Sequence, residues 1–200
     1  GQAGPKGLLS EIALVAHGGY GRRDVAPASD VDLMILHRHG AMARVTPLAE
    51  RLLRDVFDVG LQLGHSVRTP WQACRLARHD STICASLVDS RLLAGNDDLF
   101  EGFMRRFRQI VRLQPGRLMA SIRASRNEER LRYGETVFLL EPNVKRSRGA
   151  LRDLQLLRWI GFARYGLREP ELLHQQGSLT DEDFRALREA NEFLLWLRNE

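Results

Sequence analysis

The sequence has little cysteine, no long apolar run and no apolar leader. Its two cysteines, Cys74 and Cys84, are too few for a disulfide framework and lack the spacing of a metal site, so a reducing, cytoplasmic setting is expected. No stretch of about 18 consecutive apolar residues occurs, which predicts that the protein has no membrane-spanning helix. The N-terminal residues lack the apolar core of a signal peptide. We therefore expect a cytoplasmic protein with no membrane partner.

Lysine is also scarce: of the 30 basic residues, only Lys6 and Lys145 are lysines, and the formal net charge is +5. Arginine forks suit phosphate and carboxylate partners. A nucleic-acid-binding surface predicts basic residues interleaved with aromatic residues on one face. Here the arginines are spread along predicted helices beside Asp and Glu, so we expect no nucleic-acid partner. The positive charge nevertheless keeps nucleic-acid binding open as an alternative.

Hydrophobic periodicity predicts an α+β fold. Strands are expected over residues 9–17, 31–37 and 61–69, the second of them buried on both faces. A helix is expected over 46–57, with Thr46 as its N-cap, Pro47 at its first position and Glu50 completing a capping box. Further helices are expected over 71–78, from Asp80 or Ser81 to about Leu93, and over 97–113 and 117–131.

Two more helices and one short apolar piece are expected after residue 131. Residues 137–140 form the apolar piece, and Thr180 caps the final helix with Asp183 as its capping-box acid. Inward-facing positions are predicted for Leu151, Leu154, Leu157, Ile160, Phe184, Leu187, Leu194 and Leu195, and core positions for Trp71, Trp159 and Trp196. The predicted domains are therefore an α/β unit, 1–94, and a helical unit, 95–200. Because no helix-ending signal precedes Glu200, a longer parent protein is expected.

A glycine-rich turn followed by two acids is the most informative feature. Ala16-His17-Gly18-Gly19-Tyr20-Gly21-Arg22-Arg23 follows a predicted strand, and Asp30 and Asp32 open the next one. Residues i and i+2 on a strand point the same way, so two carboxylates can bracket a divalent cation. The glycines allow the backbone to approach a phosphate closely, and arginine can neutralise a triphosphate. Either half alone is a weak signal, but together they indicate a site for a nucleoside triphosphate and its metal.

These residues resemble the polymerase-β-type nucleotidyltransferase motif. Within that superfamily, the chain is similar to the bacterial PII-protein uridylyltransferase/uridylyl-removing enzymes. Two further blocks carry the narrower resemblance: Val59-Gly60-Leu61-Gln62-Leu63-Gly64-His65-Ser66-Val67-Arg68-Thr69 and Glu141-Pro142-Asn143-Val144-Lys145 with Gly149-Ala150-Leu151-Arg152-Asp153. The resemblance implies a small mixed-sheet nucleotidyltransferase core followed by an all-helical region.

The resemblance also implies an activity: transfer of a uridylyl group from UTP to a tyrosine of the PII nitrogen-signalling protein, with release of pyrophosphate. Asp30 and Asp32 would be catalytic and would hold Mg²⁺. Gly18, Gly19 and Ser29 would lie against the triphosphate, with Arg22 as a further phosphate contact. Asn143, Lys145 and Arg152 would line the nucleotide cleft, or would belong to a capped turn with a surface ion pair. The full-length protein would also carry a metal-dependent HD hydrolase domain and ACT domains.

One departure concerns a third acid, which the superfamily places on the third strand. Counting through that strand puts Gln62 at this position, and glutamine cannot act as a base. Asp58 is either a substitute or an exposed helix-end residue, and a tyrosine nucleophile needs less help because its pKa is about 10. Two alternatives therefore stay open: a nucleotidyltransferase with another nucleotide or acceptor, and a catalytically impaired domain that binds nucleotide for regulation.

His65 and Ser66 invite comparison with a catalytic pair, but neighbouring strand residues point to opposite faces. We therefore interpret His65 as a packing or hydrogen-bonding residue.

Overall fold

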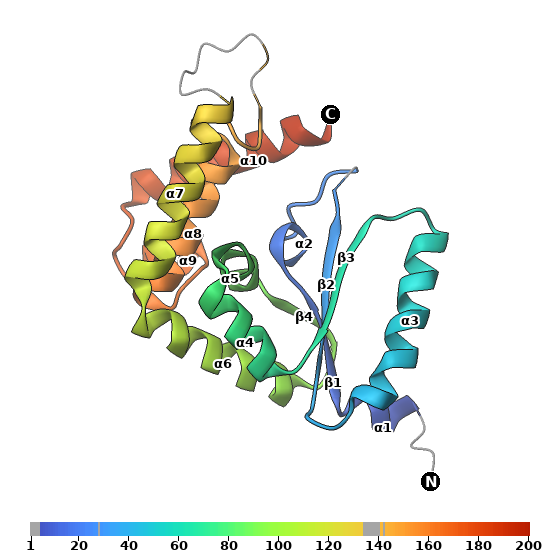
Figure 1. Ribbon diagram of the computed structural model, residues 1–200. Helices are drawn as coiled ribbons and strands as arrows, with labels where there is room; N and C mark the ends of the chain where they lie inside the picture. Colours follow the sequence, from blue (N-terminus) through green and yellow to red (C-terminus); the bar gives the residue numbers. More distant parts are fainter. Residues whose placement is uncertain (1–4, 28, 134–140, 142) are drawn as a thin grey trace. The chain divides into compact units, whose positions relative to one another are not determined.

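The computed structural model describes residues 5–27, 29–133, 141 and 143–200 (Figure 1). The chain forms two compact units, residues 1–110 and 111–200, and each is described by itself. The predicted apolar piece over 137–140 lies outside the described residues. Division of the chain into folding domains 1–94 and 95–200 stays a prediction.

The first unit is built on a four-stranded mixed sheet, which confirms the predicted α+β class. Its strands are β1 (Ile12–Ala16), β2 (Val31–His37), β3 (Leu63–Arg68) and β4 (Arg91–Gly95), in the order β3-β2-β1-β4. Strand β1 pairs antiparallel with β2 and β4, whereas β2 and β3 are parallel. The prediction of a strand over 31–37 is confirmed, because β2 has these bounds and its last five residues are buried.

Helices cover both faces of this sheet (Figure 1). On one face, α1 (Pro5–Leu9) and α3 (Met42–Asp58) pack over an apolar cluster. On the other face lie α2 (Gly18–Arg22), α4 (Pro70–His79) and α5 (Ser81–Val88). The alternation of a strand places Asp32 and Met34 toward α5 and Ile35 toward α3. The two faces of β2 therefore differ: one builds core and the other builds a cavity.

Helix α3 begins earlier than predicted, so the prediction that Thr46 caps it is wrong. The helix starts at Met42 and Pro47 lies inside it. The Thr46 hydroxyl donates to the Met42 carbonyl at 2.9 Å instead of capping the helix. Val45 is fully buried, so packing of the first turn outweighs the preference of proline for a helix start.

The region after Asp80 was also predicted incorrectly. Asp80 does cap α5, accepting hydrogen bonds from the backbone N–H groups of Thr82 and Ile83 at 2.8 and 3.0 Å. The predicted continuation to Leu93 is wrong, because α5 ends at Val88 and the chain returns as β4. Pairing with β1, far away in sequence, decides this segment, and local periodicity carries no trace of such pairing. At the N-terminus the predicted strand is likewise too long, since residues 5–9 form α1.

Helix α6 (Asp97–Leu113) joins the units, and the second unit contains α7 (Pro115–Tyr133), α8 (Leu151–Tyr165), α9 (Pro170–Gln175) and α10 (Asp181–Asn199). Thr180 is confirmed as the N-cap of α10, because its hydroxyl accepts from the Asp183 N–H at 3.1 Å. The Asp183 carboxylate accepts from that hydroxyl at 2.8 Å. None of the described α10 residues is buried; the four leucine and phenylalanine positions predicted to face inward are half-buried.

The face of α8 differs from the one predicted. Its buried residues include Leu151, Gln155, Trp159 and Phe162, which follow helical spacing, whereas Leu154, Leu157 and Ile160 are only half-buried. Of the three tryptophans predicted to lie in the core, Trp159 is buried. Trp71 and Trp196 are exposed, at 55 % and 57 %, so that prediction is wrong for both.

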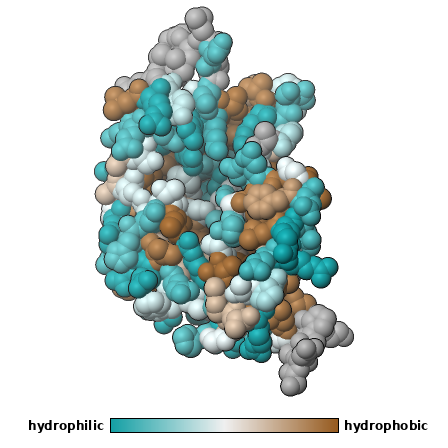
Figure 2. Space-filling model, turned by 45° about the vertical axis from the view of Figure 1, so that its right-hand side comes forward, coloured by the Kyte–Doolittle hydropathy of each residue, from teal (hydrophilic) through white to brown (hydrophobic). Residues whose placement is uncertain are grey.

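The surface is hydrophilic with apolar patches (Figure 2). Phe57, Val59 and Leu61, at the end of α3 and just after it, are among the exposed large apolar residues. Within the described ranges, no helix combines the length and the apolar character needed to span a bilayer.

Candidate active site

The two acids of the motif lie at the start of β2. Asp32 is the second residue of the strand and is half-buried, whereas Asp30 precedes the strand and is exposed. Val31 pairs with Leu63 in the parallel register of β2 and β3, so Asp32 lies directly opposite Gly64 of β3. The structure therefore places Asp32 at the edge where β2 and β3 begin.

Two glycines flank the Asp32 carboxylate. A Cβ at Gly64 would lie 2.5 Å from Asp32 Oδ1, and a Cβ at Gly18 would lie 2.7 Å from Asp32 Oδ2. Real Cβ atoms do not approach an oxygen so closely, so any side chain at either position would displace this carboxylate. Gly18 also has a φ of +57°, which favours glycine independently. The observed position of the Asp32 carboxylate therefore requires glycine at both neighbouring positions.

Strand β3 supplies no third carboxylate. Gln62 precedes β3, and its carbonyl accepts a hydrogen bond from Val31 N–H at 2.9 Å. Extending the register places Gln62 beside Asp30, just as Gly64 lies beside Asp32. Asp58 is the exposed last residue of α3, as a helix-end residue would be. Among the described residues, no group of three or more His, Cys, Asp or Glu side chains is placed to hold a metal ion.

The glycine turn forms the short helix α2 immediately after β1. A Cβ at Gly21 would lie 2.0 Å from the Asp89 carbonyl oxygen, so this position accepts only glycine. Gly19, in contrast, has no neighbour closer than 3.9 Å to such an atom. The turn is thus fixed at Gly21 by close packing and is open at Gly19, where a ligand can approach the backbone.

Arg22 is held by two acids in the interior. Its Nε donates to Asp24 and its Nη1 to Asp89, both at 2.7 Å, and the Asp89 side chain is fully buried. Burial alone would lower the pKa of Arg22, but the two carboxylates outweigh it and raise this pKa above its ordinary value. The guanidinium predicted to contact phosphate therefore ties α2 to the turn after α5.

Ser29 stabilises the loop that leads to Asp30. Its hydroxyl accepts from the Ala26 N–H at 2.9 Å, and its own N–H donates to the Ala26 carbonyl at 2.8 Å. This local turn sets the direction in which the chain enters β2. A contact between Ser29 and a phosphate stays a prediction.

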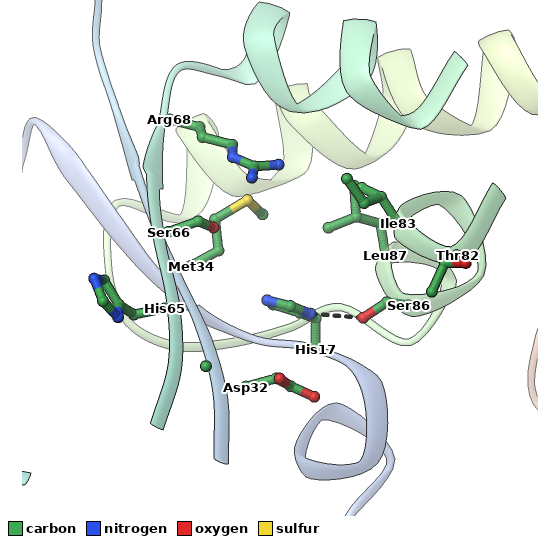
Figure 3. A pocket seen from close by; sticks show the side chains of 11 residues that line it. His17, Asp32, Met34, His65, Ser66, Arg68, Thr82, Ile83, Ser86 and Leu87 are labelled. Carbon is green, nitrogen blue, oxygen red and sulfur yellow. Dashed lines mark hydrogen bonds between the residues drawn. The ribbon is translucent and has the colours of Figure 1, made fainter. Parts of the chain in front are cut away.

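A cavity of about 350 Å³ opens beside Asp32, between the sheet and α5 (Figure 3). His17, at the end of β1, projects into it and shares a 2.7 Å hydrogen bond with the Ser86 hydroxyl. Burial lowers the pKa of His17; the nearby Asp32 carboxylate raises it, and the Arg68 guanidinium lowers it again. The imidazole therefore lies between an anion and a cation within one cavity.

Three of the cavity residues were not selected from the sequence. His17 lies within the glycine motif but was given no role, and Ser86 and Arg68 come from segments remote from it. Nothing in local sequence connects Ser86 with His17, whereas the strand alternation of β3 does place Arg68 on the Gly64 face. His65 extends from the opposite side of β3, as the same alternation predicts, and it is exposed (Figure 3).

Asn143 and Lys145 belong to the second unit. The Asn143 side-chain oxygen accepts from the backbone N–H groups of Lys145 and Arg146 at 3.0 and 2.9 Å, which makes it the start of a capped turn. Asp153 accepts from the Arg126 guanidinium at 2.7 Å. The capped-turn interpretation is confirmed, and nucleotide contact by Asn143 and Lys145 stays a prediction.

A family model and several curated proteins match this chain. Residues 117–200 match the family model described as GlnD PII-uridylyltransferase. The chain is 40 % identical over 192 residues to the bifunctional uridylyltransferase/uridylyl-removing enzyme of Aromatoleum aromaticum, covering 96 % of the chain and 22 % of that enzyme. It is 39 % identical over 196 residues to the Burkholderia pseudomallei enzyme of the same name, with the same coverage.

A third relative is the protein of that name from a Bradyrhizobium species, with 36 % identity over 188 residues, 94 % of the chain and 20 % of the relative. The chain therefore spans about a fifth of the length of the curated relatives that it matches.

Proposed function

Because the chain belongs, over the segment that it spans, to the family of bifunctional uridylyltransferase/uridylyl-removing enzymes, we propose that it carries their nucleotidyl-transfer site. The proposed reaction transfers the uridylyl group of UTP to a tyrosine hydroxyl of the PII signalling protein and releases pyrophosphate. One observation carries the proposal: the Asp32 carboxylate lies between Gly18 and Gly64, with one oxygen beside each. The glycine turn and the acidic strand thus meet at one carboxylate.

The donor set suits Mg²⁺, which takes one or two carboxylates together with phosphate oxygens and water. Asp30 and Asp32 would hold the ion, and Gly64 has no side chain that would displace Asp32 Oδ1. A bound Mg²⁺ would neutralise charge on the triphosphate. The lack of a third carboxylate on β3 fits a site that substrate oxygens complete.

The chain's own residues would position the triphosphate. Gly18 and Gly19 would present backbone N–H groups to it, since the turn is open at Gly19. Ser29 would hold the entry to β2 and contact the triphosphate. Arg22 would hold the glycine turn in place for the triphosphate, because Asp24 and Asp89 already bind its guanidinium. We also propose Asn143 and Lys145 as nucleotide contacts.

The proposed step is an in-line displacement at the α-phosphorus of UTP. A bond forms from the tyrosine oxygen to this phosphorus, while the bond from the phosphorus to the oxygen that bridges it to the β-phosphate breaks. Pyrophosphate leaves with that oxygen, and the phenol proton passes to solvent. A phenol has a pKa of about 10, so it ionises more readily than an aliphatic alcohol. This property fits a site that has Gln62 at the position where a third acid was expected.

We propose that the full-length protein carries an HD hydrolase domain, which would remove the uridylyl group, and ACT domains. The word "bifunctional" in the names of the relatives supports a second activity, and the chain corresponds to 20–22 % of their length.

Incubation with labelled UTP, Mg²⁺ and PII tests the proposal. Label should appear on a PII tyrosine, and Asp32→Asn should abolish transfer by removing a carboxylate while keeping the side-chain size. Asp55→Asn, on the exposed side of α3, serves as the matched control. Absence of transfer under conditions in which a full-length relative is active would overturn the proposal. Replacing UTP with ATP, or PII with another acceptor, tests the related alternative of a different specificity.

A second candidate function follows from Gln62 and Gly64. With no acid on β3, the domain would bind nucleotide and metal as a regulatory module. Gln62→Glu should then create or strongly raise transfer, because the register places residue 62 beside Asp30. Transfer by the unsubstituted chain at the rate of a full-length relative would exclude this candidate.

A further inference from the structure

The cavity beside Asp32 has a chemistry of its own, distinct from that of the glycine turn. Its volume is about 350 Å³. Its floor is the sheet, through β2 and β3, and its opposite wall is α5 (Figure 3). Asp32 marks one end, and Arg68 pairs in the parallel register with Leu36, four residues further along β2. At a strand rise of about 3.3 Å per residue, this separation is about 13 Å.

Apolar side chains face each other across this cavity. Met34 projects from β2, and Ile83 and Leu87 project from α5 (Figure 3). Met34 and Leu87 are almost completely buried, with exposures of 1 % and 2 %. Two opposed groups of apolar side chains suit the faces of a flat ring, and the polar side chains of Ser66, Arg68 and Ser86 also line the cavity.

Arg68 supplies the directional polar group. It is half-buried and points into the cavity (Figure 3). No side-chain hydrogen bond or ion pair links its guanidinium to any residue that the structure describes. Arginine is only a donor, with five N–H groups in a fixed fork. Arg68 therefore needs an acceptor, and between the apolar side chains of Met34 and Leu87 a ring that carries carbonyl oxygens supplies one.

We propose that this cavity is the nucleoside subsite and that Arg68 selects a base with carbonyl acceptors, such as a uracil ring, held between Met34 and the α5 side chains. The ring would be bound at the far end from Asp32, with the phosphates toward Gly18 and Gly19. An adenine ring presents an amino group and has no carbonyl oxygen, so it offers Arg68 a poorer edge. The inference rests on the proposed function and adds the group that distinguishes UTP from ATP.

Calorimetric titration of the chain with UTP, ATP and inorganic triphosphate, each with Mg²⁺, tests this assignment. The unsubstituted chain should bind UTP more tightly than ATP. Arg68→Ala should weaken UTP binding about 10- to 100-fold, as expected for the loss of a charge-assisted hydrogen bond, and should leave triphosphate binding unchanged. Arg68→Lys should restore only part of the affinity, because lysine keeps the charge without the planar fork. Arg78→Ala, on the exposed part of α4, is the matched control.

A second variant tests the cavity independently of Arg68. Ile83→Phe adds volume to the α5 wall, so it should weaken UTP binding and spare inorganic triphosphate.

The outcomes separate the two proposals. Equal losses for UTP and triphosphate in Arg68→Ala would assign Arg68 to phosphate binding and overturn the subsite. Unchanged UTP binding in both Arg68→Ala and Ile83→Phe would also overturn it, while leaving the proposed function intact. Failure of the unsubstituted chain to bind any of the three ligands would overturn both.

Discussion

Gly64 faces Asp32 across the parallel pair of β2 and β3, and its missing side chain leaves room for one oxygen of the Asp32 carboxylate. A methyl group at position 64 would lie 2.5 Å from Oδ1, so the carboxylate would have to turn away. Gly64→Ala should therefore abolish Mg²⁺-dependent UTP binding in calorimetry. Unfolding in urea should show a modest loss of stability, about 1–3 kcal/mol, typical of overpacking.

Gly102→Ala is the matched control for this change. Gly102 lies in α6 with no atom within 4 Å of an added Cβ, so alanine should raise stability slightly and leave UTP binding intact. Retention of UTP binding in Gly64→Ala would show that UTP binding does not depend on the position of Asp32 Oδ1.

The buried Arg22–Asp89 pair predicts a large stability effect. Asp89→Asn removes one charge and leaves the Arg22 guanidinium, 8 % exposed, with Asp24 as its acidic partner among the described residues. Breaking a buried pair in this way costs about 3–5 kcal/mol, which urea unfolding can measure. The exposed pair Arg51–Asp55 is the comparison, and Asp55→Asn should change stability by less than about 1 kcal/mol. Similar costs for the two variants would contradict the prediction.

Pro47 predicts a gain in stability. It lies inside α3, where it lacks an N–H for the helix ladder. Pro47→Ala restores that hydrogen bond, although alanine makes the unfolded chain more flexible. The net effect should be stabilisation of about 1–2 kcal/mol, measured by urea unfolding. Glu50→Ala, an exposed change on the same helix, should be nearly neutral. No gain from Pro47→Ala would indicate that α3 begins at Pro47 in solution.

The two cysteines predict slow thiol chemistry in the folded chain. Burial raises the pKa of Cys74 to about 11 and that of Cys84 to about 12. At pH 8 the thiolate fraction of Cys74 is then about one in a thousand, so a disulfide reagent should react with neither residue until urea unfolds the chain. Because burial raises both pKa values, the folded state favours the neutral thiols. Their contribution to the free energy of unfolding is complete below about pH 9 and is lost as the pH rises toward 11 and 12. Rapid labelling of the folded chain at pH 8 would contradict the burial of both thiols.

Local patterns predicted the elements whose signals are local. Strand β2 was predicted with its observed bounds because it is apolar except for Asp32 and His37. The N-caps at Asp80 and Thr180 were visible as capping residues before helices. The α+β class followed from these elements. The acidic pair and the glycine turn were likewise readable, because both depend on residue type and short spacing.

Long-range pairing was not predictable in this way. Strand β4 was mistaken for helix because its identity depends on β1, and the interior role of Arg22 depends on Asp89, 67 residues away. The hydrogen bond between His17 and Ser86 joins residues 69 apart. The residue of β3 that lies opposite each acid could not be predicted either, because it depends on the register of β2 and β3. That register pairs Asp32 with Gly64.

The position of β1 inside the sheet has a consequence for synthesis. This strand is made before β4, and one of its two edges stays unpaired until Arg91–Gly95 has left the ribosome. Until then the nascent chain exposes a free apolar strand edge, which is the kind of surface that chaperones protect and that aggregates when synthesis stalls. Truncations that end before residue 91 should therefore be insoluble, even though they retain both Asp30 and Asp32.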